Sequence, residues 1–115
     1  QYFEALVYFN DDEYHKAAKI FRKLLEQDPT YYRCYEQLLE IFWNQDIEIV
    51  APDEAAKYVE IMKENEPFAY TYVLEGKYYL KIGDPDSAIV PLKKARRRDK
   101  ENNEIDRLLR KAGAR

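Results

Sequence analysis

Few side chains in this sequence have the types and spacing that catalysis or metal binding requires. The single histidine, His15, closely follows Asp11 and Asp12, and imidazole and carboxylate groups are common metal ligands. No further ligand stands at a suitable spacing, so we expect His15 to lie on the surface. The single cysteine, Cys34, lies in an apolar stretch without a histidine near it. We expect it to be a small core or half-buried residue and not a nucleophile.

The sequence motifs that mark enzymes are also lacking. There is no glycine-rich phosphate loop, no paired-cysteine motif and no nucleophile elbow. The many carboxylates stand where helix caps and surface charges are expected. We therefore predict a protein without catalytic residues, metal or cofactor, which is not an enzyme.

One acidic pair has a spacing that suits recognition. Glu36 and Glu40 are four residues apart, which places them one turn apart on one face of a helix. Two such carboxylates can receive a lysine or arginine from a partner. The alternative is a pairing within the chain, with Arg33 or Lys77.

A basic run near the C-terminal end is the strongest local charge feature. It consists of Lys93, Lys94, Arg96, Arg97, Arg98 and Lys100. The run can bind an anionic surface such as RNA, lipid head groups or an acidic protein segment. Alternatively, it forms a solvated helix face whose cations are favourable near a helix C-terminus. The net charge of −3 gives no general attraction to nucleic acid, so RNA is the weakest of the hypotheses.

The composition favours a single domain of packed helices. The length of 115 residues suits one domain, and 46% hydrophobic and 36% charged residues with three glycines suit surface-charged helices. No apolar run approaches the roughly 20 residues that a membrane-spanning helix needs. No targeting segment is visible. We expect a soluble protein, with the cytoplasm favoured, although the chain begins with Gln1 and the compartment stays open.

The apolar spacing predicts seven helices. They cover residues 2–10, 13–27, 30–44, 52–65, 68–82, 85–98 and 104–112. Gly83 is expected to end the fifth helix, Asp84 to cap the sixth, and Asn102 or Asn103 to cap the last. Pro91 is expected to bend the sixth helix without breaking it. Residues 45–51 interrupt the pattern, and either fold back on the hairpin or extend the third helix by a turn.

Three alanines reveal an internal repeat. Ala17, Ala55 and Ala88 occupy similar frames of apolar residues and lie 38 and 33 residues apart. A period near 34 predicts a stack of helical hairpins, none of which buries its apolar face alone. We therefore predict one all-α domain over residues 1–115, a solenoid of three hairpins. The repeats cover about 1–31, 32–68 and 69–101, and a capping helix covers about 103–112.

These residues resemble the tetratricopeptide repeat family over nearly the whole chain. The matching residues are Ala5, Tyr8, Ala17, Phe21, Leu24 and Pro29 in the first repeat; Tyr35, Phe42, Ala55, Val59, Met62 and Pro67 in the second; and Tyr72, Gly76, Tyr79, Gly83, Asp84, Ala88, Leu92 and Ala95 in the third. The second repeat departs from the pattern at Leu39, where a small residue is expected, and in its insertion. The third has Lys100 in place of the terminal proline.

The resemblance implies a right-handed superhelix whose first helices line a concave groove. The partner-binding residues that this phase predicts are Trp43, Glu36, Glu40, Arg33 and Lys77, followed by Tyr2, Phe9, Tyr70 and Lys81. The alternative for several of these aromatic residues is packing between hairpins. A subclass of the family clamps the terminal carboxylate of chaperone peptides, but Glu36 and Glu40 at the matching positions would repel that ligand.

The function expected from these observations is a non-catalytic module that binds a peptide or helix of another protein in its groove, as adaptors, assembly factors and chaperones do. One alternative is a self-associating scaffold, or part of a longer repeat array, that uses the apolar residues of the first helix. RNA or anionic-lipid binding through residues 93–100 is the weaker alternative.

Overall fold

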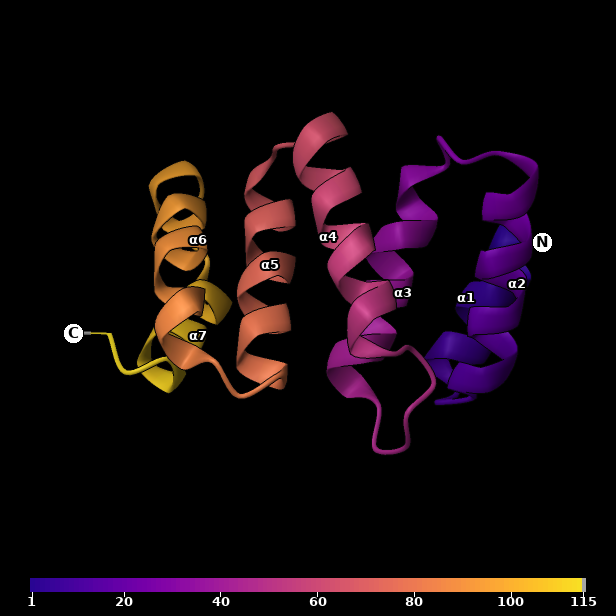
Figure 1. Cartoon of the computed structure of the whole chain (residues 1–115), viewed down its shortest axis with the longest axis horizontal. Coiled ribbons are helices and arrows are strands. Elements are labelled where there is room, and N and C mark those ends of the chain that lie inside the picture. Colours follow the sequence, from indigo (N-terminus) through magenta and orange to yellow (C-terminus); the bar gives the residue numbers. More distant parts are fainter. Residues whose placement is uncertain (115) are drawn as a thin grey trace. The chain divides into compact units, whose positions relative to one another are not determined.

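The computed structural model describes residues 1–114, and all regular elements among them are helices (Figure 1). These are α1 (Tyr2–Asn10), α2 (Tyr14–Gln27), α3 (Tyr32–Asn44), α4 (Pro52–Asn65), α5 (Ala69–Lys81), α6 (Pro85–Arg98) and α7 (Asn103–Lys111). The predicted all-α fold class is confirmed, and each predicted helix is present with its ends within two residues of the prediction. The chain divides within α4 into two compact units, Gln1–Tyr58 and the residues from Val59 onward.

The first unit is built on the hairpin of α1 and α2, with α3 packed against α2. Ala5 of α1 and Ala17 and Ala18 of α2 are fully buried. Small side chains at these positions let two helices approach closely, and larger apolar side chains such as Phe21 and Leu38 then fill the space beside them. The turn between the helices includes Asp12, whose backbone takes a positive φ of 61°.

The segment that interrupts the repeat folds back as a loop, so α3 is not extended. Gln45 follows the last residue of α3, and its side chain is buried against the loop. Its Oε1 accepts hydrogen bonds from the backbone N–H groups of Ile49 (3.0 Å) and Val50 (2.8 Å), and its Nε2 donates to the carbonyl of Val50 (2.9 Å). One amide side chain thus holds both ends of the loop together.

The most extensive helix contact within the second unit joins α5 and α6. A Cβ atom placed on Gly76 of α5 would lie 2.5 Å from the Cγ and Cδ2 atoms of Leu92 on α6. Ala88, Leu92 and Ala95 of α6 are fully buried. The repeat pattern placed small residues at Gly76, Ala88 and Ala95 for this reason: the helices touch where a side chain is absent or short.

The predicted helix ends of the second unit are confirmed. Gly83 takes a φ of 83°, the left-handed conformation that glycine adopts after a helix, and Asp84 Oδ1 accepts from the backbone N–H of Ser87 at 3.3 Å. Asn102 Oδ1 accepts from the N–H of Glu104 at 3.0 Å. Helix α6 runs without interruption past Pro91.

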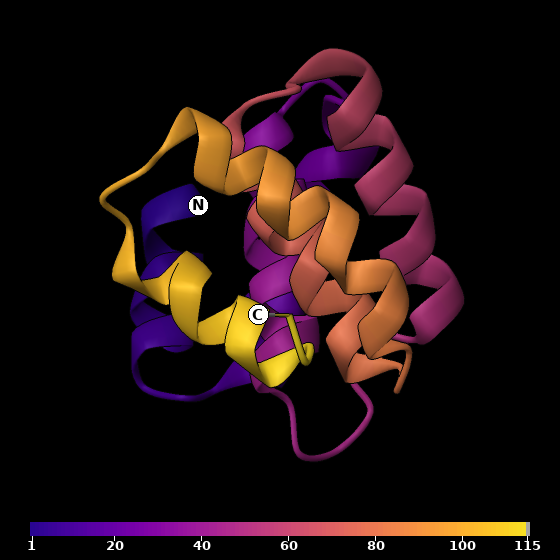
Figure 2. The same cartoon turned by 90° about the vertical axis from the view of Figure 1, so that its left-hand side faces the viewer.

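Helix α7 packs against both α5 and α6 (Figure 2). Its apolar side chains are buried in the second unit: Ile105, Leu108 and Leu109. The charged side chains of α7 alternate with these, which is the pattern expected of a helix that covers the end of a repeat.

Candidate functional site

The main predicted partner-binding residues form a stripe on α3, within the first unit. The other face of this helix belongs to the core, with Cys34, Tyr35, Leu38, Leu39, Ile41 and Phe42 buried. Arg33 is exposed, and Glu36, Glu40 and Trp43 are half-buried. We refer to these four residues as the α3 stripe. The residues that the apolar spacing assigned to the core side of α3 are thus buried, and the four predicted partner-binding residues lie outside that buried face.

The two predicted residues of α1 are used at least partly for packing. The ring of Tyr2 stacks on Tyr31 with centroids 5.3 Å apart, and Phe9 meets Tyr14 edge-on at 5.4 Å. Burial raises the pKa of Tyr2, while a hydrogen bond with Gln37 and the charge of Arg33 oppose the rise. Tyr2 is thus placed beside the α3 stripe. Both Tyr2 and Phe9 keep part of their surface exposed.

The predicted residues of α5 fall into two groups in the second unit. Tyr70 and Lys81 are exposed. Lys77 is buried, with 4% of its surface exposed, and its Nζ lies 3.6 Å from Glu104 Oε2 of α7. Its ammonium group therefore takes part in an ion pair inside the second unit. The sequence pattern did not anticipate this pair, because the register of α7 against α5 is set by tertiary packing.

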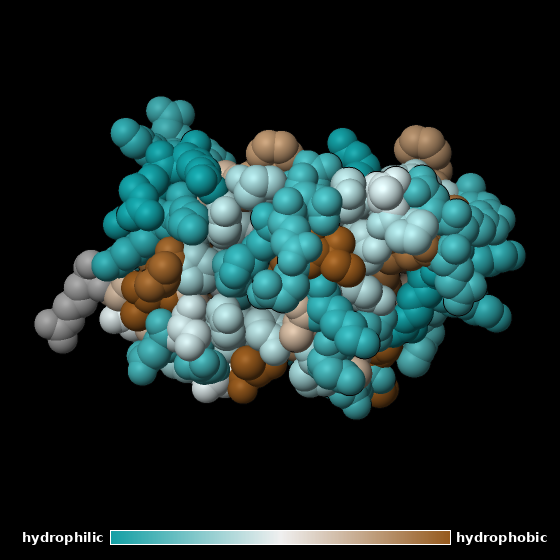
Figure 3. Space-filling model, turned by 45° about the horizontal axis from the view of Figure 1, so that its top comes forward, coloured by the Kyte–Doolittle hydropathy of each residue, from teal (hydrophilic) through white to brown (hydrophobic). Residues whose placement is uncertain are grey.

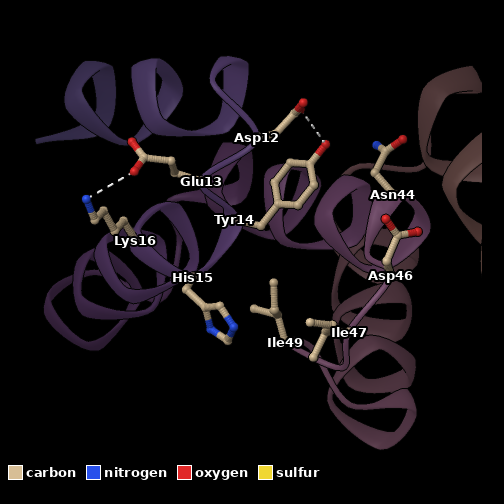
Figure 4. A pocket seen from close by; sticks show the side chains of 9 residues that line it. All are labelled: Asp12, Glu13, Tyr14, His15, Lys16, Asn44, Asp46, Ile47 and Ile49. Carbon is tan, nitrogen blue, oxygen red and sulfur yellow. Dashed lines mark hydrogen bonds and ion pairs between the residues drawn. The ribbon is translucent and has the colours of Figure 1, made fainter.

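A pocket of about 600 Å³ opens where α2 begins, beside the loop that follows α3 (Figure 4). Its lining residues are Asp12, Glu13, Tyr14, His15, Lys16, Asn44, Asp46, Ile47 and Ile49. We call it the loop pocket. Glu13 is paired with Lys16 at 3.1 Å, and the Tyr14 hydroxyl donates to Asp12 at 3.1 Å. The side chain of His15 points toward Ile49 (Figure 4).

The electrostatics of the loop pocket are acidic. Burial raises the pKa of Tyr14, and its hydrogen bond with Asp12 and the negative charges of Asp12 and Asp46 raise it further. Ile47 is 73% exposed. Among the described residues, no group of three or more histidine, cysteine or carboxylate side chains is placed to hold a metal ion. The arrangement suits a cationic side chain with an apolar stem. The sequence pattern did not predict this pocket, although the extra length of the second repeat marks the loop that lines one side of it.

The predictions for the two most reactive side-chain types are confirmed. His15 is exposed at the surface. Cys34 is fully buried, and burial raises the pKa of its thiol to about 11. A thiol in this environment stays protonated at neutral pH and is a poor nucleophile.

A partly buried ion pair joins α2 to the start of α4 in the first unit. The sequence pattern did not predict it. Arg22 binds Glu54 through two hydrogen bonds of 2.9 and 2.8 Å, and also donates to the carbonyl of Ile49 at 2.7 Å. The Tyr58 hydroxyl donates to the same carboxylate. Burial alone would raise the pKa of Glu54, but the hydrogen bonds from Arg22 and Tyr58 outweigh it and lower the pKa.

Because of this ion pair, the free energy of unfolding should depend on pH. Because the folded-state pKa of Glu54 is lowered, its contribution is fully present above the unfolded value of about 4.3 and is lost as the pH falls through the folded value. The side chains are 37% and 24% exposed, so we expect Glu54→Gln to cost about 1 kcal/mol at pH 7 and clearly less at pH 3, below the unfolded pKa of about 4.3. Urea unfolding at several pH values measures this, with the exposed Glu26→Gln as the control. An equal cost at both pH values would contradict the prediction.

Together, the helices and their contacts define a helical-repeat protein made of packed hairpins. The chain belongs to the family described as the TT21 fifth ARM repeats domain, whose family model matches residues 3–105. The resemblance to tetratricopeptide repeats is therefore supported at the level of a helical repeat. A comparison with curated proteins gave no significant match. None of the described helices has the length and apolar character needed to cross a membrane.

Proposed function

We propose that this chain is a non-catalytic interaction module that binds a peptide or helix of a partner protein through the first helices of its hairpins. Membership in a helical-repeat family supports a scaffold for protein interaction, but a fold does not by itself define a function. The observation that carries the proposal is the α3 stripe, because its four side chains share one side of α3 outside the buried face, with Arg33 exposed and the other three half-buried.

The side-chain types of the stripe suit a protein partner. Tryptophan and arginine are enriched among the residues that dominate binding energies, and the stripe has one of each, Trp43 and Arg33. Glu36 and Glu40 add negative charge on the same face and favour a partner segment with lysine or arginine. The same two carboxylates argue against a ligand that presents a terminal carboxylate.

The loop pocket extends this surface in the first unit. Asn44 follows Glu40 by one turn on α3 and also lines the pocket, where its Nδ2 donates to the carbonyl of Glu40 at 2.8 Å. An acidic stripe that leads to an acidic pocket fits a basic segment of a partner. The stripe and pocket are thus both suited to one cationic peptide or helix.

Further contacts complete the proposal. Tyr2 and Phe9 of α1 contribute the exposed parts of their rings, and Tyr70 and Lys81 of α5 are the proposed contacts of the second unit. Lys77, which the repeat phase also placed in the groove, is buried beside Glu104 and does not present its ammonium group to a partner. The proposed phase is that of tetratricopeptide repeats, in which such helices line a concave groove. The cellular role is that of an adaptor, assembly factor or chaperone-like subunit.

The decisive variant is Trp43→Ala combined with Glu40→Lys. It removes the anchor and reverses one charge of the stripe, so we expect at least about a hundredfold loss of affinity, which corresponds to about 2.7 kcal/mol. The chain, immobilised at its C-terminal end, is used to capture partners from its native source. The recovered protein is then titrated against both purified chains by calorimetry, and circular dichroism checks that the helix content is unchanged.

The matched control is Phe68→Ala with Glu64→Lys, which makes the same types of change at exposed positions of the second unit. The control should bind as the unmodified chain does. Equal binding by the stripe variant would disprove the proposal. Recovery of only the chain itself would favour self-association, for which Phe3 and Val7 of α1 are the candidate contacts because they are 79% and 59% exposed.

A further inference from the structure

Four residues of the basic run lie in two different surroundings within the second unit. Lys94 and Arg98 lie over Tyr72 of α5, and each cation is 4.8 Å from the centre of the Tyr72 ring. Arg98 also donates to the carbonyl of Pro67 at 3.3 Å. These cation–π contacts and the backbone hydrogen bond give both residues a structural role within the second unit.

The other two residues, Lys93 and Arg96, line a small cleft between α6 and α7. The cleft has a volume of about 120 Å³ and is lined by Lys93, Arg96, Asp106, Leu109, Arg110 and Ala114. The three cationic side chains come from exposed residues, and Leu109, which also lines the cleft, is buried. We call it the α6–α7 cleft. Hydrophilic side chains gather on the surface of the second unit where α6 ends (Figure 3).

The cleft has an excess of positive charge. The carboxylate that lines it, Asp106, is 3.9 Å from Arg96, and these side chains are 42% and 48% exposed. The cleft is therefore lined by three cations and one carboxylate, which is in loose contact with Arg96. A helix C-terminus favours cations in its last turn, but Lys93 lies before the last turn of α6. The dipole of α6 therefore does not account for Lys93.

The charge of the whole second unit has the same sign. Residues from Val59 onward include 13 lysines and arginines against 10 carboxylates, whereas residues 1–58 include 6 against 12. The two units thus favour partners of opposite charge. A cationic segment suits the acidic α3 stripe, and an anionic group suits the α6–α7 cleft.

We infer that the α6–α7 cleft is a docking site for aspartate or glutamate side chains of an acidic segment in a partner protein. Arginine and lysine bind carboxylates through charge-assisted hydrogen bonds. Val90 is 69% exposed and lies one turn before Lys93 on α6, where it offers a contact for an apolar residue beside the acidic one.

The size and lining of the cleft favour a protein side chain over other anionic partners. Small-molecule sites occupy about 300–1,000 Å³, well above the volume found here. Single-stranded nucleic acids bind by stacking bases on aromatic side chains, and none of the residues that line the cleft is aromatic. The site is separate from the proposed partner surface of the first unit, so either proposal can fail alone.

The test uses the full chain and a fluorescent peptide in which glutamates alternate with leucines. We expect saturable binding in an anisotropy titration at low salt. Lys93→Glu/Arg96→Glu/Arg110→Glu should weaken it at least tenfold, and the neutral variant Lys93→Gln/Arg96→Gln/Arg110→Gln should weaken it several-fold. Asp106→Asn removes the competing carboxylate and should strengthen binding two- to threefold. Circular dichroism and thermal melting confirm that each variant is folded.

The matched control is Lys19→Glu/Lys23→Glu/Lys57→Glu, which changes the net charge equally at exposed positions of α2 and α4. It should keep at least half of the affinity. An equal loss in the control would mean that only net charge matters and would overturn the inference. So would a lack of binding by the unmodified chain, or tighter binding of a uridine oligonucleotide or of phosphatidylserine vesicles than of the peptide.

Discussion

Replacing Gly76 with alanine is expected to destabilise the second unit by about 1–3 kcal/mol, although alanine is the better helix former. The new Cβ would meet Leu92 Cγ and Cδ2 at 2.5 Å, well inside van der Waals contact. Leu92 is fully buried on α6, so it has no open space into which to move. Overpacking should therefore outweigh the gain of about 1 kcal/mol in helix propensity.

A second substitution separates the two effects. Leu92→Ala removes the clashing atoms and by itself should cost about 2–5 kcal/mol. In that background Gly76→Ala should be stabilising, by up to about 1 kcal/mol, because only the helix propensity remains. Urea unfolding of the four chains of this cycle measures both effects. The same sign for Gly76→Ala in both backgrounds would show that close packing against Leu92 is not the reason for glycine at this position.

Gly76 also illustrates what could be predicted from the sequence. Helix positions, helix ends and small contact residues depend on local spacing and on the conformational preferences of glycine, proline and the capping side chains. A period near 34 residues then repeats the same packing arrangement, so Gly76 and Ala88 could be placed at a helix contact before the structure was known. The side of α3 that faces the core followed from the same periodicity.

Local spacing does not predict contacts between residues that are distant in the sequence. Arg22 and Glu54 are 32 residues apart, and nothing in the local pattern pairs them. The phase of the repeat pattern placed Lys77 in the groove, but α7 supplies Glu104 as its partner inside the second unit. The different surroundings of the four basic residues of α6 depend on where Tyr72 lies, which is also a tertiary property.

The sequence left open whether residues 45–51 fold back as a loop or extend the third helix. The side chain of Gln45 is what holds them in a loop. The side chain makes three hydrogen bonds to the backbone of Ile49 and Val50, and Val50 is fully buried. Chain flexibility opposes such a loop, because ordering each residue costs about 1–2 kcal/mol. The loop therefore depends on a side chain whose role no periodic pattern reveals, since its partners are four and five residues away in an irregular segment.

Gln45→Ala is accordingly expected to lower the stability of the first unit by about 2–3 kcal/mol, because two N–H groups and one carbonyl lose their side-chain partner. Urea unfolding measures the cost, and hydrogen exchange should accelerate at the amides of Ile49 and Val50. Gln27→Ala, at the exposed end of α2, is the control and should change neither. Unchanged exchange at Ile49 and Val50 would refute the role of Gln45.

The same variant also tests how far the partner surface extends. The loop supplies Asp46, Ile47 and Ile49 to the loop pocket, whereas the α3 stripe lies on a helix that the substitution leaves in place. Weaker partner binding by Gln45→Ala would place the pocket within that surface, and unchanged binding would confine the surface to the helices.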